Sequence, residues 1–135
     1  MTRKPVPEVE EAPRPLTPVE LELMHIVWRL GEVAVADVLT ALPPERALAY
    51  TSVSTVLRIL EQKGVVRSRK QGRGHLYSAV LPRDAYEAQS VRHLVETVFD
   101  GTPSALVARL VEAVPLSASD VDQLRELLEA KGRKP

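Results

Sequence analysis

Apolar residues recur at three- and four-residue intervals through most of the chain, which predicts six amphipathic helices. The expected helices cover residues 17–30, 35–42, 50–63, 84–99, 102–114 and 117–131. Between the third and the fourth helix, the segments 65–70 and 75–80 are typical of two strands joined by a glycine-containing turn, 71–74. A short strand over 32–34 can pair with this hairpin. The pattern therefore predicts a mostly α fold with a small β hairpin.

The order of these elements predicts two domains. Three short helices followed by a hairpin are typical of a winged helix-turn-helix, expected over residues 16–82. The three later helices are expected to form a helical dimerisation domain over 83–131. Residues 1–15 hold four prolines and few apolar side chains, which predicts a flexible leader. Residues 132–135 are expected to form a flexible tail.

The first predicted helix carries signals at both of its ends. Thr17 and Glu20 have the spacing of a capping box around Pro18, and Gly31 provides the stop. A similar pair, Ser117 and Asp120, opens the last helix. The apolar residues of the first helix form two adjacent stripes, which predicts burial on two sides. One stripe consists of Leu23, Val27 and Leu30, and the other of Leu21, Met24 and Trp28, with Trp28 expected to pack in the core.

Charge changes this picture, because the positive residues are unevenly distributed. The formal net charge is zero, with 18 basic and 18 acidic residues. Residues 51–80 nevertheless contain six basic residues and one acid, Glu61. Affinity for a polyanion depends on such local fields rather than on net charge. The asymmetry favours nucleic acid as the partner of this segment.

The third predicted helix and the hairpin supply the candidate DNA-binding residues. One helix face is apolar through Val53, Val56, Leu57 and Leu60, and the other begins with a run of hydroxyl side chains. Residues at the start of a recognition helix enter the major groove, where hydroxyls discriminate weakly between bases. Arg58 is the best candidate for a specific contact, and the hairpin cations are expected to hold phosphates. The candidates are Thr51, Ser52, Ser54, Thr55, Arg58, Arg67, Arg69, Lys70 and Arg73.

The last three helices are short, and each carries a single apolar stripe. Small units leave most of their surface in water, so packing against a second copy is the economical arrangement. Folding back on the winged domain is the alternative. The expected dimer interface contains Leu94, Val98, Leu106, Leu110, Val111, Leu124, Leu127 and Leu128.

Several motifs resemble the penicillinase-repressor family of the BlaI, MecI and CopY type. They are ELELM-x-x-x-W over Glu20–Trp28, YTSVSTVLRILEQKG over Tyr50–Gly64, HLY over His75–Tyr77, SALV over Ser104–Val107 and LVE over Leu110–Glu112. The resemblance covers about residues 16–131. It implies a homodimeric repressor whose winged helices read a palindromic operator on double-stranded DNA. It also implies a membrane sensor-protease as partner, and release of the repressor by proteolysis near its C-terminal end.

The chain departs from that family in two places. The family's cleaved Asn-Phe pair corresponds here to Arg109 and Leu110, and the whole chain lacks asparagine. These two residues mark the candidate cleavage region, but the family's cleavage dipeptide is absent. The copper-responsive branch uses cysteine ligands, and this chain has no cysteine, so a soft-metal sensor is excluded. Disulfides are excluded for the same reason, and no metal or cofactor is expected.

Other functions are less well supported by the residues. A small-molecule-responsive regulator, with an effector site between the two domains, is the main alternative, but only 4% of residues are aromatic. A winged helix that binds another protein is a second alternative. An enzyme is not expected, because no nucleophile stands beside a base and no phosphate-binding glycine loop is present. No signal peptide or membrane-length apolar run occurs, which predicts a cytoplasmic protein without membrane insertion.

Overall fold

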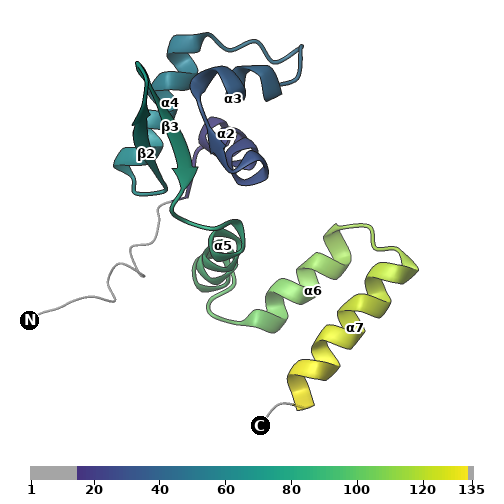
Figure 1. Cartoon of the computed structure of the whole chain (residues 1–135). Helices are drawn as coiled ribbons and strands as arrows, with labels where there is room; N and C mark the ends of the chain where they lie inside the picture. Colours follow the sequence, from purple (N-terminus) through teal and green to yellow (C-terminus); the bar gives the residue numbers. More distant parts are fainter. Residues whose placement is uncertain (1–14, 134–135) are drawn as a thin grey trace, which may run out of the picture. The chain divides into compact units, whose positions relative to one another are not determined.

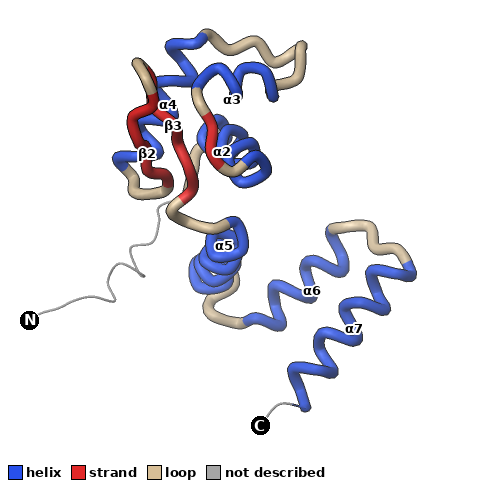
Figure 2. The backbone as a smooth tube through the Cα atoms, viewed as in Figure 1, coloured by secondary structure: helices blue, strands red, loops and turns tan. Residues whose placement is uncertain are grey.

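The computed structural model describes residues 15–133 (Figures 1 and 2). The predicted leader therefore lies outside the described residues except for Pro15, and so do residues 134–135 of the predicted tail. Gly132 and Arg133 are the last residues of a helix. The elements are α2 (Pro18–Leu30), β1 (Glu32–Val33), α3 (Val35–Ala41), α4 (Tyr50–Gln62), β2 (Val66–Gln71), β3 (Gly74–Ala79), α5 (Arg83–Thr97), α6 (Pro103–Ala113) and α7 (Ala118–Arg133). The predicted fold class is confirmed.

The chain divides into two compact units between Val91 and Arg92, within helix α5. The N-terminal unit holds α2, α3, α4, the sheet and the first turns of α5. The C-terminal unit holds the rest of α5 together with α6 and α7. Among the described residues, no helix combines the length and the apolar character that spanning a bilayer requires.

The sheet has three antiparallel strands in the order β1-β3-β2, so that β3 lies in the middle. β2 and β3 form the predicted hairpin, with Val66 opposite Ala79 and Gln71 opposite Gly74. The turn between them consists of two residues, Gly72 and Arg73, and Gly72 has a φ of 60°. A glycine with positive φ at the first turn position is typical of type II′ hairpins, whose twist matches the strands. The hairpin is therefore tighter than the four-residue turn that the sequence predicts.

The core of the N-terminal unit lies between the first three helices and one face of the sheet. The largest fully buried side chains come from every one of these elements, and they include Leu23, Met24, Val38, Leu57 and Val33. Leu30 was expected in this core, but 47% of it is exposed. It is the last residue of α2, and the chain turns away at Gly31, whose φ is 95°. The prediction for Leu30 is therefore wrong, because the helix ends before its side chain can reach the core.

Helix α2 begins with the predicted capping box. The Thr17 hydroxyl accepts a hydrogen bond from the Glu20 amide at 3.2 Å, and the Glu20 carboxylate accepts one from the Thr17 amide at 2.9 Å. Helix α7 begins in the same way, through reciprocal bonds between Ser117 and Asp120. These bonds satisfy amides that have no partner within the helix.

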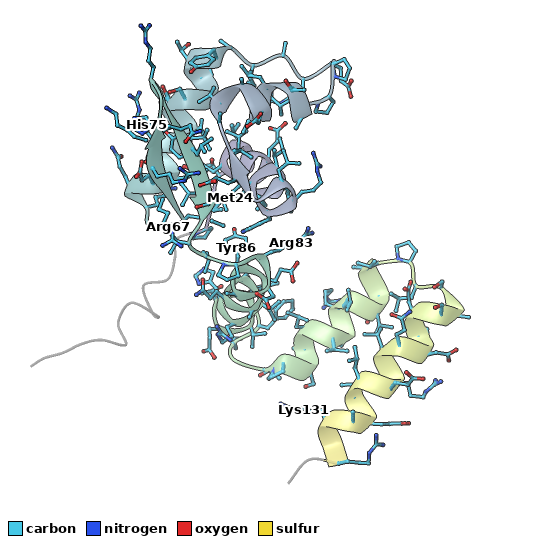
Figure 3. All side chains as sticks on the ribbon, in the orientation of Figure 1. Met24, Arg67, His75, Arg83, Tyr86 and Lys131 are labelled. Atoms are coloured by element: carbon cyan, nitrogen blue, oxygen red, sulfur yellow. The ribbon has the colours of Figure 1, made fainter. Side chains whose placement is uncertain are left out.

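Two aromatic residues, Trp28 of α2 and Tyr86 of α5, hold the first turns of α5 against the rest of the N-terminal unit. Trp28 donates from its indole nitrogen to the Leu81 carbonyl at 2.9 Å, and its ring lies 5.8 Å from that of Tyr86. The Tyr86 hydroxyl accepts a hydrogen bond from the Leu16 amide. Trp28 is thus half-buried and packs against the core, and its one polar atom, the indole nitrogen, has a hydrogen-bond partner. Figure 3 labels Tyr86 on α5.

Candidate nucleic-acid interface

Helix α4 separates an apolar face from a polar one, as its sequence predicts. Val53, Leu57 and Leu60 are fully buried in the core. The opposite face is exposed at Thr51, Ser52, Thr55 and Arg58. Ser54 is half-buried and is presented less openly than the other predicted hydroxyls. The helix therefore offers three exposed hydroxyls in its first two turns and an arginine one turn further on.

The N-terminus of α4 favours negative charge. The residue at the cap position is Ala49, no side chain caps the helix, and its first turn has no acidic residue. Uncapped amides at a helix start carry a partial positive charge that phosphate groups can satisfy. Tyr50, the first residue of α4, is 58% exposed beside these amides. Sequence reasoning missed it as a candidate; its signal is an aromatic residue directly before the run of hydroxyls.

The hairpin places its cations on two different faces. Side chains alternate along a strand, so Arg67 and Arg69 of β2 lie on one face, and Ser68 and Lys70 lie on the other. The second face is the one that carries the buried Val66 and Tyr77. Ser68 on this face donates a hydrogen bond from its hydroxyl to Glu61 of α4 at 2.9 Å. We call the face with Ser68 and Lys70 the α4 side of the sheet, and the face with Arg67 and Arg69 the outer face.

Arg69 forms a two-pronged ion pair on the outer face. Its Nε and Nη2 atoms donate to the two carboxylate oxygens of Glu32 at 2.8 and 3.0 Å. Its third nitrogen, Nη1, donates to the Gln71 side chain at 3.3 Å. The hydrogen bond from Arg69 lowers the pKa of Glu32, and Glu32 in turn raises the pKa of Arg69. Sequence reasoning placed Arg69 among the phosphate contacts, and nothing in its spacing indicated this internal partner.

Two further ion pairs link α2 to the segments on either side of the exposed α4 face. Lys63, directly after α4, donates from Nζ to the buried carboxylate of Glu20 at 2.7 Å. Arg46, in the loop before α4, donates to both carboxylate oxygens of Glu22, at 2.9 to 3.1 Å. Burial raises the pKa of Glu20, but the hydrogen bonds from Lys63 and Thr17 outweigh this effect and leave the pKa below its usual value. The segments before and after α4 are thus both tied to α2.

The cations of residues 51–80 therefore fall into two groups. Lys63 and Arg69 are held by glutamates from α2 and β1. The other four form no ion pair with any residue in the part of the chain that the structure describes: Arg58, Arg67, Lys70 and Arg73. In Figure 3, Arg67 is seen near the base of the hairpin and His75 nearer its tip. All four lie on α4 or on the hairpin beside it, so their fields add over one region of the surface.

A three-stranded sheet with a basic hairpin, beside a helix whose polar face is exposed, is typical of DNA-binding transcription regulators of the winged-helix class. Residues 16–130 match the family model described as penicillinase repressor. The chain belongs to this family of transcriptional repressors, and it is not an enzyme.

Two relatives in sequence agree with this assignment, and one solved domain is similar in part. The transcriptional regulator BlaI of Mycobacterium tuberculosis is 34% identical over 123 residues, which cover 87% of this chain and 88% of that protein. The penicillinase repressor of Bacillus licheniformis is 24% identical over 132 residues, covering 97% and 98% of the two chains. The solution structure of the DNA-binding domain of the repressor BlaI aligns with a TM-score of 0.47 at 24% identity, covering 53% of this chain and 87% of that domain.

Proposed function

We propose that this protein is a cytoplasmic homodimeric repressor that reads an inverted-repeat operator. In this proposal the exposed face of α4 enters the major groove and the hairpin wing holds phosphates beside it. The observation that carries the proposal is the separation of paired from unpaired cations described above. Arg58 lies on the exposed side of α4, and Lys70, Arg67 and Arg73 lie on the hairpin beside it, whereas Lys63 and Arg69 are held by glutamates of the same chain.

The proposed contacts divide into base and phosphate contacts. Thr51, Ser52 and Thr55 project from the exposed start of α4, and Arg58 follows one turn later on the same side. An arginine can contact guanine through two hydrogen bonds, so Arg58 is the proposed specificity residue. Lys70 and Arg73 near the wing tip, with Arg67 at its base, are proposed to neutralise phosphates.

The proposed dimer interface lies on the C-terminal helices. No residue of α5, α6 or α7 is buried in the single chain, and α6 and α7 pack only sparsely against each other. Leucines and valines remain exposed along all three helices and directly after α5: Leu127 is 67% exposed, Val111 is 54% exposed, and Val98, which follows α5, is 62% exposed. Apolar surface of this extent marks a site of association, and a second copy covers two such surfaces at once.

We further propose that the repressor is released when the dimer is disrupted. A monomer keeps half of the DNA contacts and loses the gain from tethering two half-sites. Proteolysis in α6 by a membrane sensor-protease is one route to this state, and Arg109–Leu110 is the candidate bond. Arg109 is exposed and paired with Glu112 inside a regular helix, so cleavage there requires α6 to unwind first. Genes for β-lactamases or related stress responses are the proposed targets, by analogy with the named relatives.

Binding to the DNA upstream of the protein's own gene tests this proposal. If each protomer neutralises about four phosphates, the logarithm of affinity should fall against the logarithm of salt concentration with a slope of about −7. Fluorescence anisotropy with a labelled duplex, at several potassium chloride concentrations, measures this slope. A scrambled duplex of equal length should bind more weakly by roughly a thousandfold or more. Equal affinity for the two duplexes would rule out operator recognition.

A further inference from the structure

We infer that Arg69 is a positioning residue of the wing: together with Glu32 it straps the three strands of the sheet across their outer face. This role replaces the phosphate contact that the sequence suggests for Arg69. The inference rests on the proposed DNA-binding function, because it concerns how the wing is held when the wing meets DNA.

The strap crosses the whole sheet. Glu32 lies on β1 and Arg69 lies on β2, and the middle strand β3 runs between them. Glu32 is paired in register with Ser78 of β3, and Arg69 is paired with Leu76, two residues away on the same strand and the same face. The ion pair therefore passes over β3 and joins the two edge strands directly, 37 residues apart in sequence. Backbone ladders alone link β1 to β2 only through β3.

The guanidinium of Arg69 has little capacity left for a phosphate. All three of its nitrogens donate to acceptors of this chain, two to Glu32 and one to Gln71. One N–H group on Nη1 and one on Nη2 remain free, but a phosphate that bound the Nε–Nη2 edge would have to replace the Glu32 carboxylate, which offers a negative charge and the same two-oxygen geometry. The exchange of one anion for another gives little net attraction.

Arg67 provides a natural comparison. It stands two residues from Arg69 on the same strand and the same face, and it is also exposed. No acidic side chain in residues 15–133 lies within ion-pair distance of it. One of these two neighbouring arginines is thus held by a carboxylate and the other is not.

The position of the strap explains what it can do for DNA binding. β1 ends at Val33, opposite Tyr77, so only β2 and β3 continue toward the wing tip. Lys70, Arg73 and His75 lie in this two-stranded part, and isolated two-stranded hairpins are only marginally stable. The strap runs from Glu32, in the three-stranded part, to Arg69, the first residue of β2 beyond it, and so fixes the direction in which the tip leaves the sheet. The tip cations then meet phosphates without first losing conformational freedom.

Four variants separate a positioning residue from a phosphate ligand. Arg69→Lys keeps the positive charge but lacks the fork that spans β3. Glu32→Gln keeps the size of the carboxylate but removes its charge, Arg69→Ala removes the other half of the strap, and Arg67→Ala is the matched control. Each variant is titrated with the operator duplex across a range of salt concentrations, after circular dichroism has confirmed folding.

The two roles predict opposite results. If Arg69 positions the wing, Arg69→Lys, Arg69→Ala and Glu32→Gln should each lower operator affinity by about threefold to tenfold. The salt slope should stay near that of the wild type. A double variant that combines Glu32→Gln with Arg69→Ala should bind no more weakly than either single variant. Arg67→Ala should instead flatten the slope by about 0.9 per protomer. The inference is overturned if Glu32→Gln tightens binding, or if Arg69→Ala flattens the slope as Arg67→Ala does while Arg69→Lys stays at wild-type affinity.

Hydrogen exchange of the free protein gives a readout that does not depend on DNA. Glu32→Gln and Arg69→Ala should speed exchange of the amides of residues 70–75 to a similar extent, and Arg67→Ala should leave them unchanged. Equal exchange in all variants would also overturn the inference. Failure of the wild type to bind any duplex would count against the proposed function alone, because the exchange result would still stand.

Discussion

The two units of this chain differ in what they bury. The N-terminal unit encloses a closed core, with nine side chains almost completely removed from water. The C-terminal helices bury no residue in the single chain, although α6 and α7 each carry an apolar stripe. Regular amphipathic helices therefore do not by themselves make a domain, since each apolar face still needs a surface to cover it. From this comparison we expect the first unit to fold by itself and the second to depend on the proposed association.

Replacing a core leucine should give the largest effect and sharpen this contrast. Leu57→Ala removes a fully buried side chain of α4 and should cost about 2–5 kcal/mol of unfolding free energy. Leu128→Ala, at a position that is 60% exposed in the single chain, should destabilise the protein only through association. Urea unfolding at several protein concentrations measures both. The contrast breaks down if the stability that Leu128→Ala loses does not depend on protein concentration.

A charge in the proposed interface should separate the two copies. Leu127→Asp should give a folded monomer in analytical ultracentrifugation, and its operator affinity should fall by roughly a hundredfold or more, because tethering of half-sites is lost. Leu30→Asp is the matched control, as another exposed leucine outside the C-terminal helices. If Leu127→Asp stays dimeric, the interface lies elsewhere.

Discrimination between base sequences should depend on the N-terminal unit alone. Arg58→Ala should lower operator affinity by about 1–3 kcal/mol and change base preference near its contact. Arg67→Ala should weaken all sequences by similar factors, because a phosphate contact carries no sequence information. Neither variant should change the sedimentation coefficient. Identical binding profiles for the two variants would contradict the roles assigned to them.

Acid should weaken the first unit through Glu20. Because its pKa is lowered in the folded protein, its ion pair adds stability above the unfolded pKa, and that stability is lost as the pH falls through the folded pKa. At pH 7, Glu20→Gln should cost about 1–2 kcal/mol, because it removes the charged partner of Lys63 while the glutamine oxygen can still accept from the Thr17 amide. The difference from wild type should shrink below about pH 4. A constant difference between pH 7 and pH 3 would show that the charge of Glu20 is not the cause.

The sequence predicted local features more reliably than long-range ones. The capping boxes at Thr17 and Ser117 depend on residues three positions apart, and both are confirmed. The hairpin followed from two short strand-like segments separated by a turn that contains two glycines. The partners of Glu20 and Glu32 lie 43 and 37 residues away, and no local pattern reports such distances. Leu30 fitted the apolar stripe of the first helix, but the stripe could not show that the helix ends before the Leu30 side chain can reach the core.

The anchoring of α4 has a consequence for redesign. Its buried leucines and the ion pairs of Arg46 and Lys63 all lie away from the exposed side chains Thr51, Ser52 and Thr55. The three outward positions can thus be exchanged without disturbing what fixes the helix in place. A library randomised at these three codons alone, with Glu20 and Lys63 retained, should yield regulators of altered promoter choice that keep the melting temperature of the parent.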